Sequence, residues 1–123
     1  MRGQPSLAGH TVLIMEDEFY MAEDAAAAVR GAGGDVIGPC STEADAFRAI
    51  EGRSISVAML DVNLGSGPSF AVARSLQQSG APFLFLIGYD FDVIPAEFAS
   101  IVKLQKPAEM RKVVRCLAAL ANA

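Results

Sequence analysis

Four charged residues, Glu16, Asp17, Asp61 and Lys106, each follow closely on an apolar run of the chain. Taken singly, such a carboxylate caps a helix or forms a turn, and such a lysine is a surface charge. Gathered in one place, the carboxylates would repel one another by about 4 kcal/mol per close pair at a surface-like dielectric constant. A fold that keeps them together therefore needs cations, which a bound metal ion and the Lys106 ammonium would supply.

The donor atoms favour one kind of metal. Only oxygen donors are present, and no histidine or cysteine stands near them in the sequence, which favours Mg2+ over Zn2+. An aspartate beside Mg2+ and a lysine can attack a phosphoryl group and form an acyl phosphate. The metal and the lysine would neutralise charge on the phosphoryl oxygens during an in-line transfer. Glu18, the next acid along, serves equally well as the cap of a following helix.

The elements that must position these residues alternate regularly. Short apolar runs predict strands, and five of them occur, at 11–15, 36–37, 55–60, 83–87 and 101–104. Amphipathic stretches between them predict helices, except that 88–99 is only weakly helical because Pro95 lies in its middle. Five β-α units predict an α/β fold with a single five-stranded parallel sheet and helices on both faces. The carboxyl ends of parallel strands share one edge, where chemistry is expected.

Helix boundaries and faces follow from local signals. Thr42 is expected to begin the second helix, and Gly33–Gly34 to end the first. Pro68 and Pro107 are expected at the first positions of the third and the last helix. The apolar residues expected on the buried helix faces are Phe19, Ala22, Ala26, Val29, Phe47, Ile50, Phe70, Ala73, Leu76, Met110, Val113, Val114 and Leu117.

Composition restricts the domain organisation, the partners and the cellular compartment that we expect. A chain of 123 residues with 52% hydrophobic and 20% charged residues suits one globular domain, which we expect at 9–123 after an N-terminal extension at 1–8. The net charge of −4 argues against a nucleic-acid or membrane partner. Cys40 and Cys116 are interpreted as free thiols in a reducing compartment. Without a signal peptide or a membrane span in the sequence, we expect a cytoplasmic protein.

These motifs resemble the receiver domain of response regulators in two-component systems, the family that includes the chemotaxis response regulator. The resemblance is carried by Val12–Glu18, Ala58–Leu64 and Gln105–Pro107, in this order and spacing, and covers the chain from about Gly9 to its end. It implies a (βα)5 flavodoxin-like fold. It also implies two-component phosphorelay signalling through protein contacts, with a histidine kinase or phosphotransfer protein and a downstream protein as partners.

The resemblance assigns roles residue by residue. Asp61 would accept the phosphoryl group, beside a Mg2+ ion held directly by Asp17 and through water by Glu16. The backbone carbonyl of Asn63 would be a further metal ligand. Lys106 would hold the phosphoryl group, and the peptide bond that follows it is expected to be cis.

Two positions depart from the family pattern. The fourth strand of such receivers ends in Ser or Thr, whereas this chain has Ile87, which leaves the Gly88 backbone N–H to contact a phosphoryl oxygen. The aromatic switch position holds Lys103, whose side chain we expect to reach solvent. We therefore interpret the acceptor as competent, and the usual hydroxyl-and-aromatic switch as inoperative. The apolar residues of the 88–99 segment, Phe91, Val93, Ile94 and Phe98, either pack over the sheet or form a face that reorganises on signalling.

Other functions stay open. A pseudo-receiver would keep the fold and bind partners without being phosphorylated, which Ile87 and Lys103 favour and the acidic residues disfavour. A phosphatase with an aspartyl-phosphate intermediate generally has an acid two residues after the nucleophile, where this chain has Asn63. We thus expect a phosphoacceptor domain and not an enzyme. A flavin protein is disfavoured because no phosphate-binding loop follows the first strand. No output domain is expected within the chain, and a homodimer is possible.

Overall fold

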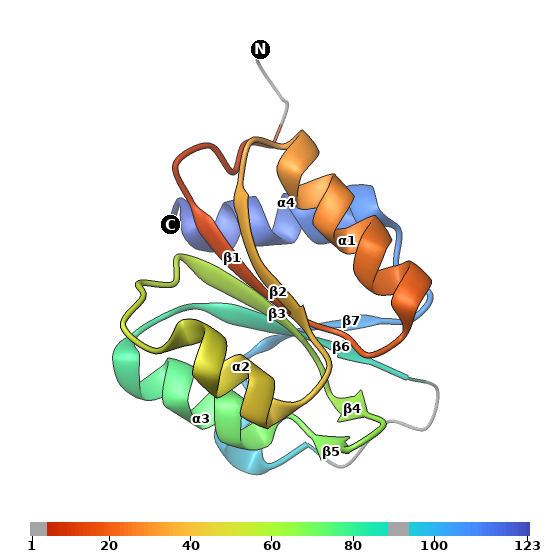
Figure 1. Ribbon diagram of the computed structural model, residues 1–123, viewed down its shortest axis with the longest axis vertical. Helices are drawn as coiled ribbons and strands as arrows, with labels where there is room; N and C mark the ends of the chain where they lie inside the picture. Colours follow the sequence, from red (N-terminus) through yellow and green to blue (C-terminus); the bar gives the residue numbers. More distant parts are fainter. Residues whose placement is uncertain (1–4, 89–93) are drawn as a thin grey trace.

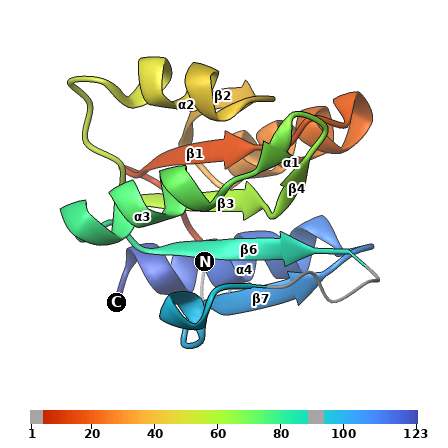
Figure 2. The same ribbon diagram turned by 90° about the horizontal axis from the view of Figure 1, so that it is seen from below.

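The computed structural model describes residues 5–88 and 94–123 and has a five-stranded parallel sheet at its centre. The strand order is β2-β1-β3-β6-β7, and neighbouring strands run in the same direction (Figure 2). The strands are β1 (Thr11–Met15), β2 (Asp35–Cys40), β3 (Val57–Asp61), β6 (Phe83–Ile87) and β7 (Val102–Gln105). The predicted fold class is confirmed, and the fourth predicted strand has the bounds expected of it.

Four α-helices cover the two faces of the sheet (Figure 1). One face carries α1 (Phe19–Gly31) and α4 (Met110–Ala121), and the other carries α2 (Glu43–Ile50) and α3 (Phe70–Ser79). Thr42 is the N-cap of α2 as predicted, because its hydroxyl accepts a hydrogen bond of 3.0 Å from the Asp45 N–H. No helix within the described residues is long and apolar enough to cross a membrane.

Two hydrophobic cores lie on either side of the sheet. Every residue of β3 and β6 is buried, and alternate residues enter opposite cores, as expected for central parallel strands. Leu7, in the predicted N-terminal extension, also belongs to the core on the α1 and α4 side and donates a backbone hydrogen bond to Ala32. The chain therefore packs against the domain from at least this residue onward.

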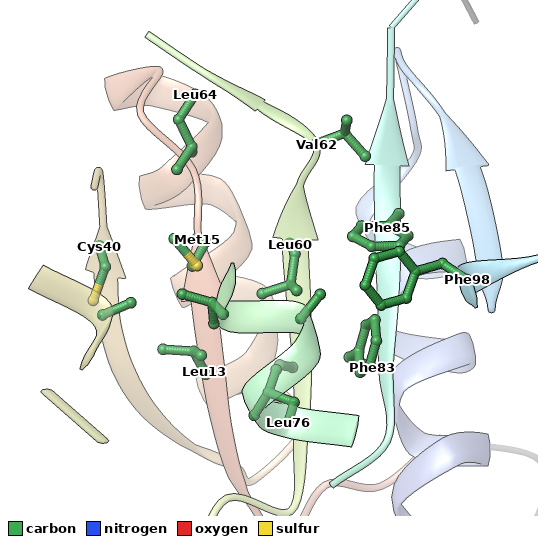
Figure 3. Packing of buried hydrophobic residues seen from close by; sticks show 14 of the residues in the cluster. Leu13, Met15, Cys40, Leu60, Val62, Leu64, Leu76, Phe83, Phe85 and Phe98 are labelled. Carbon is green, nitrogen blue, oxygen red and sulfur yellow. The ribbon is translucent and has the colours of Figure 1, made fainter. Parts of the chain in front are cut away.

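The described part of the segment between β6 and β7, residues 94–101, contains a short 3-10 helix, η1 (Ala96–Phe98). Phe98 is fully buried and contacts three other rings at centroid distances of 5.4–6.2 Å. It is stacked with Phe70 and meets Phe83 and Phe85 edge to face. Figure 3 shows the rings of Phe83, Phe85 and Phe98 side by side along β6. Ile94 also packs against this core. For these two residues the structure supports packing over the sheet, whereas Phe91 and Val93 lie outside the described residues.

Two residues expected on buried helix faces are exposed. Phe19 is 66% exposed because the buried stripe of α1 begins one turn later, at Ala22. Phe47 is 40% exposed because the one buried residue of α2 is Ala46, and the next position lies about 100° further round the helix. Both predictions were wrong for the same reason: alanines, and not the aromatic residues, form the buried face of these helices where they contact the sheet.

The expected helix starts at Pro68 and Pro107 were also wrong. Pro68 lies in a two-stranded antiparallel hairpin, β4 (Asn63–Leu64) and β5 (Gly67–Pro68), and α3 begins only at Phe70. Pro107 precedes α4 by three residues, and the bond before it is cis, as expected from the family resemblance. Both cysteines are free thiols, as predicted.

Candidate functional site

The strand register brings the predicted site residues to one edge of the sheet. Met15 pairs with Leu60, so Glu16 and Asp61 lie level at the ends of β1 and β3. Ile87 at the end of β6 pairs with Gln105, and its carbonyl accepts a 2.7 Å hydrogen bond from the Lys106 N–H. This register gathers the residues that the sequence placed after separate apolar runs.

Asp61 is held in one orientation at the centre of the site. Its side chain is only 5% exposed. Its Oδ1 accepts a 3.1 Å hydrogen bond from the Asn63 N–H, and its Oδ2 lies 2.5 Å from Lys106 Nζ. The same ammonium lies 3.1 Å from Glu16 Oε1, so Lys106 bridges the two buried carboxylates.

The other two acids are fixed by backbone amides. Glu16 is 2% exposed, and its Oε2 accepts a 3.1 Å hydrogen bond from the Glu18 N–H. Glu18 itself caps α1, since its carboxylate accepts from the Met21 N–H. Asp17 is exposed, and its Oδ2 accepts a 2.5 Å hydrogen bond from the Gly65 N–H in the β4–β5 hairpin.

Gly65 is a site residue that the sequence reasoning missed. A Cβ at this position would lie 2.8 Å from Asp17 Oδ2, so a side chain would displace the carboxylate. The available signal was the glycine pair, Gly65 and Gly67, two and four residues past Asn63. That pair was interpreted as a turn leading into a helix, whereas it forms a hairpin that reaches back to the site.

The electrostatics of the site leave negative charge in excess. Burial raises the pKa of the Glu16 carboxyl, and the neighbouring Asp61 carboxylate adds to the rise, against the lowering effects of the Glu18 N–H and the Lys106 ammonium. For Lys106, burial alone would lower the pKa, but the hydrogen bond and negative charge of Asp61, helped by Glu16, raise it. Two buried acids, Glu16 and Asp61, therefore share a single ammonium that stays protonated, and Asp17 lies nearby without an ion pair among the described residues.

The residues present fit a divalent cation. One carboxylate oxygen from each of Glu16, Asp17 and Asp61 lies within 4.8 Å of the others. Glu16 Oε1 is buried and has no hydrogen bond of good geometry among the described residues, its close contact being the Lys106 ion pair. A small hard cation with several water ligands would satisfy these oxygens. The predicted ligand Asn63 lies at the same edge, where its backbone is tied to Asp61.

Ile87 and Gly88 stand beside the acidic cluster without adding a hydroxyl. Ile87 is 9% exposed and packs with Phe83 and Phe85 in the core on the α2 and α3 side. Gly88 is half-buried, and within the part of the chain that the structure describes no heavy atom beyond its chain neighbours lies within 4 Å of the position that a Cβ would take. The strand end is therefore apolar where the family pattern has a hydroxyl.

The expectation that the Lys103 side chain reaches solvent was wrong. Its ammonium donates hydrogen bonds to the carbonyls of Phe98, Ala99 and Ile101, at 2.9, 3.2 and 2.7 Å. These carbonyls end η1 and the turn after it, where free carbonyl groups favour a cation. Lys103 thus fastens the segment that precedes β7.

Comparison with known proteins gave a consistent result. No protein-family model matches the sequence, and no curated protein matches it either. Among solved structures, the chain is similar to SdrG from Sphingomonas melonis, with 35% identity, 90% of this chain and 95% of that chain covered, and a TM-score of 0.77. It is also similar to the REC domain of the PhyR response regulator from Erythrobacter litoralis, with 25% identity, 94% and 91% coverage, and a TM-score of 0.78. A response regulator receiver protein from Sinorhizobium medicae, at 24% identity, 96% and 98% coverage and a TM-score of 0.78, shares the fold.

The chain belongs to the response-regulator receiver domains. The resemblance gives this receiver an expected pattern, and the acidic residues and the lysine named in that pattern lie together at one edge of the sheet. The switch positions do not follow that pattern, because Ile87 is part of the hydrophobic core and Lys103 is bonded to backbone carbonyls. The acidic site therefore has the residue types of the family pattern, whereas the two switch positions do not.

Proposed function

We propose that this receiver takes a phosphoryl group on Asp61 from a histidine kinase or phosphotransfer protein and signals through contacts with a downstream protein. The observation that carries the proposal is the buried Asp61 carboxylate, with Lys106 Nζ at 2.5 Å and the Glu16 and Asp17 oxygens within 4.8 Å. A structural ion pair would need one acid and one base. The surplus of buried negative charge at a strand edge is better explained by a site for a cation and a phosphoryl group.

The proposed phosphoryl transfer follows from the contacts of the two Asp61 carboxylate oxygens. The Asn63 N–H fixes Oδ1, so the carboxylate is oriented before a donor arrives. Attack of an Asp61 oxygen on the phosphorus of a phosphohistidine would form the O–P bond of an acyl phosphate. The N–P bond breaks as its electron pair returns to the imidazole nitrogen. Lys106, released from its ion pair as the aspartate charge is lost, would pair with a phosphoryl oxygen instead.

Mg2+ is the cofactor we propose, with Glu16, Asp17, Asp61 and the Asn63 backbone carbonyl as its protein ligands or water-mediated contacts. When bound, such an ion neutralises charge on the phosphoryl oxygens. The chain's own part is to hold the carboxylates in place, through the Glu18 and Gly65 N–H groups. Because only oxygen donors are supplied, a soft metal has no advantage at this site.

The Ile87 position limits how firmly the phosphoryl group is held. A hydrogen bond to a charged group contributes about 1.5–3 kcal/mol net, so lacking the hydroxyl weakens phosphoryl stabilisation roughly tenfold to a hundredfold. The Gly88 N–H, directly after the end of β6, offers a second contact. We infer a receiver that is phosphorylated but holds the group less tightly than one with a hydroxyl. It would act as a phosphoacceptor in the cytoplasm and would catalyse no reaction besides its own phosphorylation and dephosphorylation.

The second candidate function is a pseudo-receiver that binds partners without phosphorylation. The observation in its favour is that both switch positions have other structural roles. Ile87 packs in the hydrophobic core, and the Lys103 ammonium donates hydrogen bonds to backbone carbonyls. Magnesium titration separates the candidates. A site that binds no Mg2+ at millimolar concentration would favour the pseudo-receiver.

The decisive experiment is incubation with acetyl phosphate and Mg2+ followed by intact-mass measurement. We expect wild type to gain one phosphoryl group and Asp61→Ala to gain none. Asp17→Asn should gain it more slowly, because one candidate metal ligand is neutralised. A wild-type protein that gains nothing, or an Asp61→Ala variant that gains as much as wild type, would overturn the proposal.

A further inference from the structure

Each of the three acids of the site accepts a hydrogen bond from a backbone amide, and one of these bonds differs from the others. The bonds to Glu16 and Asp61 are local, because each comes from the amide two residues further along the chain. The third joins distant parts of the chain, since the Gly65 N–H reaches Asp17 Oδ2 at 2.5 Å from 48 residues away. Asp17 is exposed and forms no ion pair among the described residues. The Gly65 amide is therefore the group that orients this carboxylate.

The β4–β5 hairpin that carries Gly65 is anchored at both of its ends. It follows β3 at the carboxyl edge of the sheet (Figure 1), and its Leu64 is 5% exposed within the hydrophobic core. At its other end the Ser69 N–H donates a 3.2 Å hydrogen bond to the Val62 carbonyl. The turn of the hairpin is thus held in place beside the first strand.

Backbone conformation does not explain the glycine at position 65. Its φ lies outside the left-handed region that favours glycine, unlike that of Gly67 in the same hairpin, whose φ is +135°. Apart from its chain neighbours, a Cβ at Gly65 would meet a single atom of the described residues, Asp17 Oδ2 at 2.8 Å. The missing side chain therefore makes room for this carboxylate and for no other group that the structure describes.

The amide also restricts how Asp17 can bind a cation. It shares the charge of Oδ2 and keeps the carboxylate from turning, which leaves Oδ1 without a partner in the described part of the chain. Mg2+ requires nearly ideal octahedral geometry, whereas Ca2+ accepts more oxygens in flexible geometry and can take both oxygens of one carboxylate. A carboxylate that is fixed through one of its oxygens therefore suits Mg2+ better than Ca2+.

We propose that Gly65 is a positioning residue that gives the site a preference for Mg2+ over Ca2+. Its N–H holds Asp17 in one orientation, and its lack of a Cβ allows the close approach. Because Gly65 has no polar side chain of its own, it acts through that carboxylate alone. The inference rests on the metal site of the proposed function, but it does not depend on phosphoryl transfer.

The test measures cation binding to unphosphorylated protein. Backbone amide chemical shifts of isotope-labelled protein are followed while Mg2+ or Ca2+ is added at constant ionic strength, and each titration gives a Kd. The variant is Gly65→Ala, which should fold because its one conflict is with an exposed side chain. The matched control is Gly31→Ala at the far end of α1, where a Cβ has no neighbour within 4 Å among the described residues.

We expect the Kd for Mg2+ to rise roughly tenfold in Gly65→Ala, because the Cβ displaces a ligand that an outer contact had oriented. The Kd for Ca2+ should rise by only about twofold to threefold, since Ca2+ tolerates a turned carboxylate. The preference for Mg2+ then falls several-fold. Gly31→Ala should change neither Kd by more than about twofold.

A second background separates positioning from a general loss of structure. Asp17→Ala removes the group on which Gly65 acts. Adding Gly65→Ala to it should therefore leave both Kd values within about twofold of those of Asp17→Ala alone. A further tenfold loss in the double variant would mean that the change at position 65 damages the hairpin itself, and it would overturn the proposal.

The other outcomes are equally distinct. Unchanged Mg2+ binding in Gly65→Ala would overturn the proposal, and so would an equal loss of affinity for Mg2+ and Ca2+. A wild-type protein that binds no Mg2+ would overturn this inference together with the proposed metal site. The expected cation response in a protein that acetyl phosphate does not label would support this inference while overturning the proposed phosphoryl transfer.

Discussion

The carboxyl ends of β1 and β3 and the segment that precedes β7 lie at opposite edges of the sheet, and their polar groups are used in opposite ways. At the acidic site, Glu16 and Asp61 share a single ammonium, and the nearby Asp17 has no ion pair among the described residues, so negative charge is left over. In the described segment before β7 and at its start, the charged side chains of Glu97 and Lys103 both have partners within the protein. Lys103 donates to three carbonyls, and Arg74 pairs with Glu97 through two nitrogens at 3.0–3.2 Å while lying 5.8 Å from the centre of the Phe98 ring.

This difference suggests that the acidic site is suited to bind a cation, whereas the segment before β7 is not suited to change conformation. Uncompensated charge costs stability in the free protein and is recovered when a cation binds, so the acidic site is arranged for a ligand. A segment whose polar groups are already bonded and whose Phe98 ring is fully buried has little to gain from moving. We therefore expect changes at the acidic site to depend on Mg2+, and changes before β7 to be independent of it.

The largest expected effect concerns Lys106→Met in metal-free protein. The change leaves Glu16 and Asp61 buried without their shared counter-charge, and Lys106 is itself only 26% exposed. Breaking such a pair should lower the free energy of unfolding by about 2–3 kcal/mol. Mg2+ should restore part of that loss, because a cation then compensates the same carboxylates. Urea denaturation in EDTA and in Mg2+ measures both quantities.

The matched control for this variant is Lys112→Met, on the exposed face of α4. It removes the same charge from the surface and should change the free energy of unfolding by less than about 0.5 kcal/mol, with or without Mg2+. If Lys106→Met were as mild as Lys112→Met, the carboxylates would not depend on the ammonium, and the contrast between the two regions would fail.

A second effect is expected at Ile87, which ends β6 and belongs to the same hydrophobic core as Phe98. Ile87→Thr supplies the hydroxyl that the strand end lacks and should lengthen the lifetime of the Asp61 acyl phosphate roughly tenfold to a hundredfold. The cost is a smaller, partly polar group in the core, about 1–2 kcal/mol of unfolding free energy. The lifetime is measured by intact mass after acetyl phosphate is removed.

Ile87→Val is the control, because valine has the shape of threonine without its hydroxyl. It should share the part of the stability loss that comes from the missing methylene group, and it should leave the lifetime unchanged. Equal lifetimes for the threonine and valine variants would mean that the hydroxyl cannot reach the phosphoryl group.

Much of this site could be predicted from the sequence because the end of each strand is marked by a local sequence pattern. A charged residue directly after an apolar run stays at the end of its strand, and parallel strands bring such ends together, so Glu16, Asp61 and Lys106 were placed correctly. The Gly65 amide was not predictable in this way. It reaches Asp17 through a two-residue hairpin, and the pairing of Asn63 with Pro68 depends on backbone geometry that no periodicity reveals.

The direction in which side chains point was the other feature that the sequence did not predict. The exposure of Phe19 depends on where α1 first touches the sheet, and the sequence identifies a helical face without saying where contact begins. Lys103 was harder still. Its register opposite Phe85 turns it toward η1, and its length lets the ammonium reach carbonyls two, four and five residues earlier. A lysine on an edge strand ordinarily reaches solvent, so the outcome needed the tertiary structure.

The smallest expected effect concerns that lysine. Lys103→Met keeps the aliphatic stem but removes the donor to three carbonyls, and because the ammonium is only half-buried we expect a loss of about 1–2 kcal/mol of unfolding free energy. Hydrogen exchange should quicken at the Phe98, Ala99 and Ile101 amides, whose bonds close η1 and its turn. The rate of Asp61 labelling by acetyl phosphate should stay within about twofold, since the acidic site has its own anchors. A labelling rate that falls in step with faster exchange would instead show that the fastened segment supports the acceptor, and the two regions would have to be treated as one coupled unit.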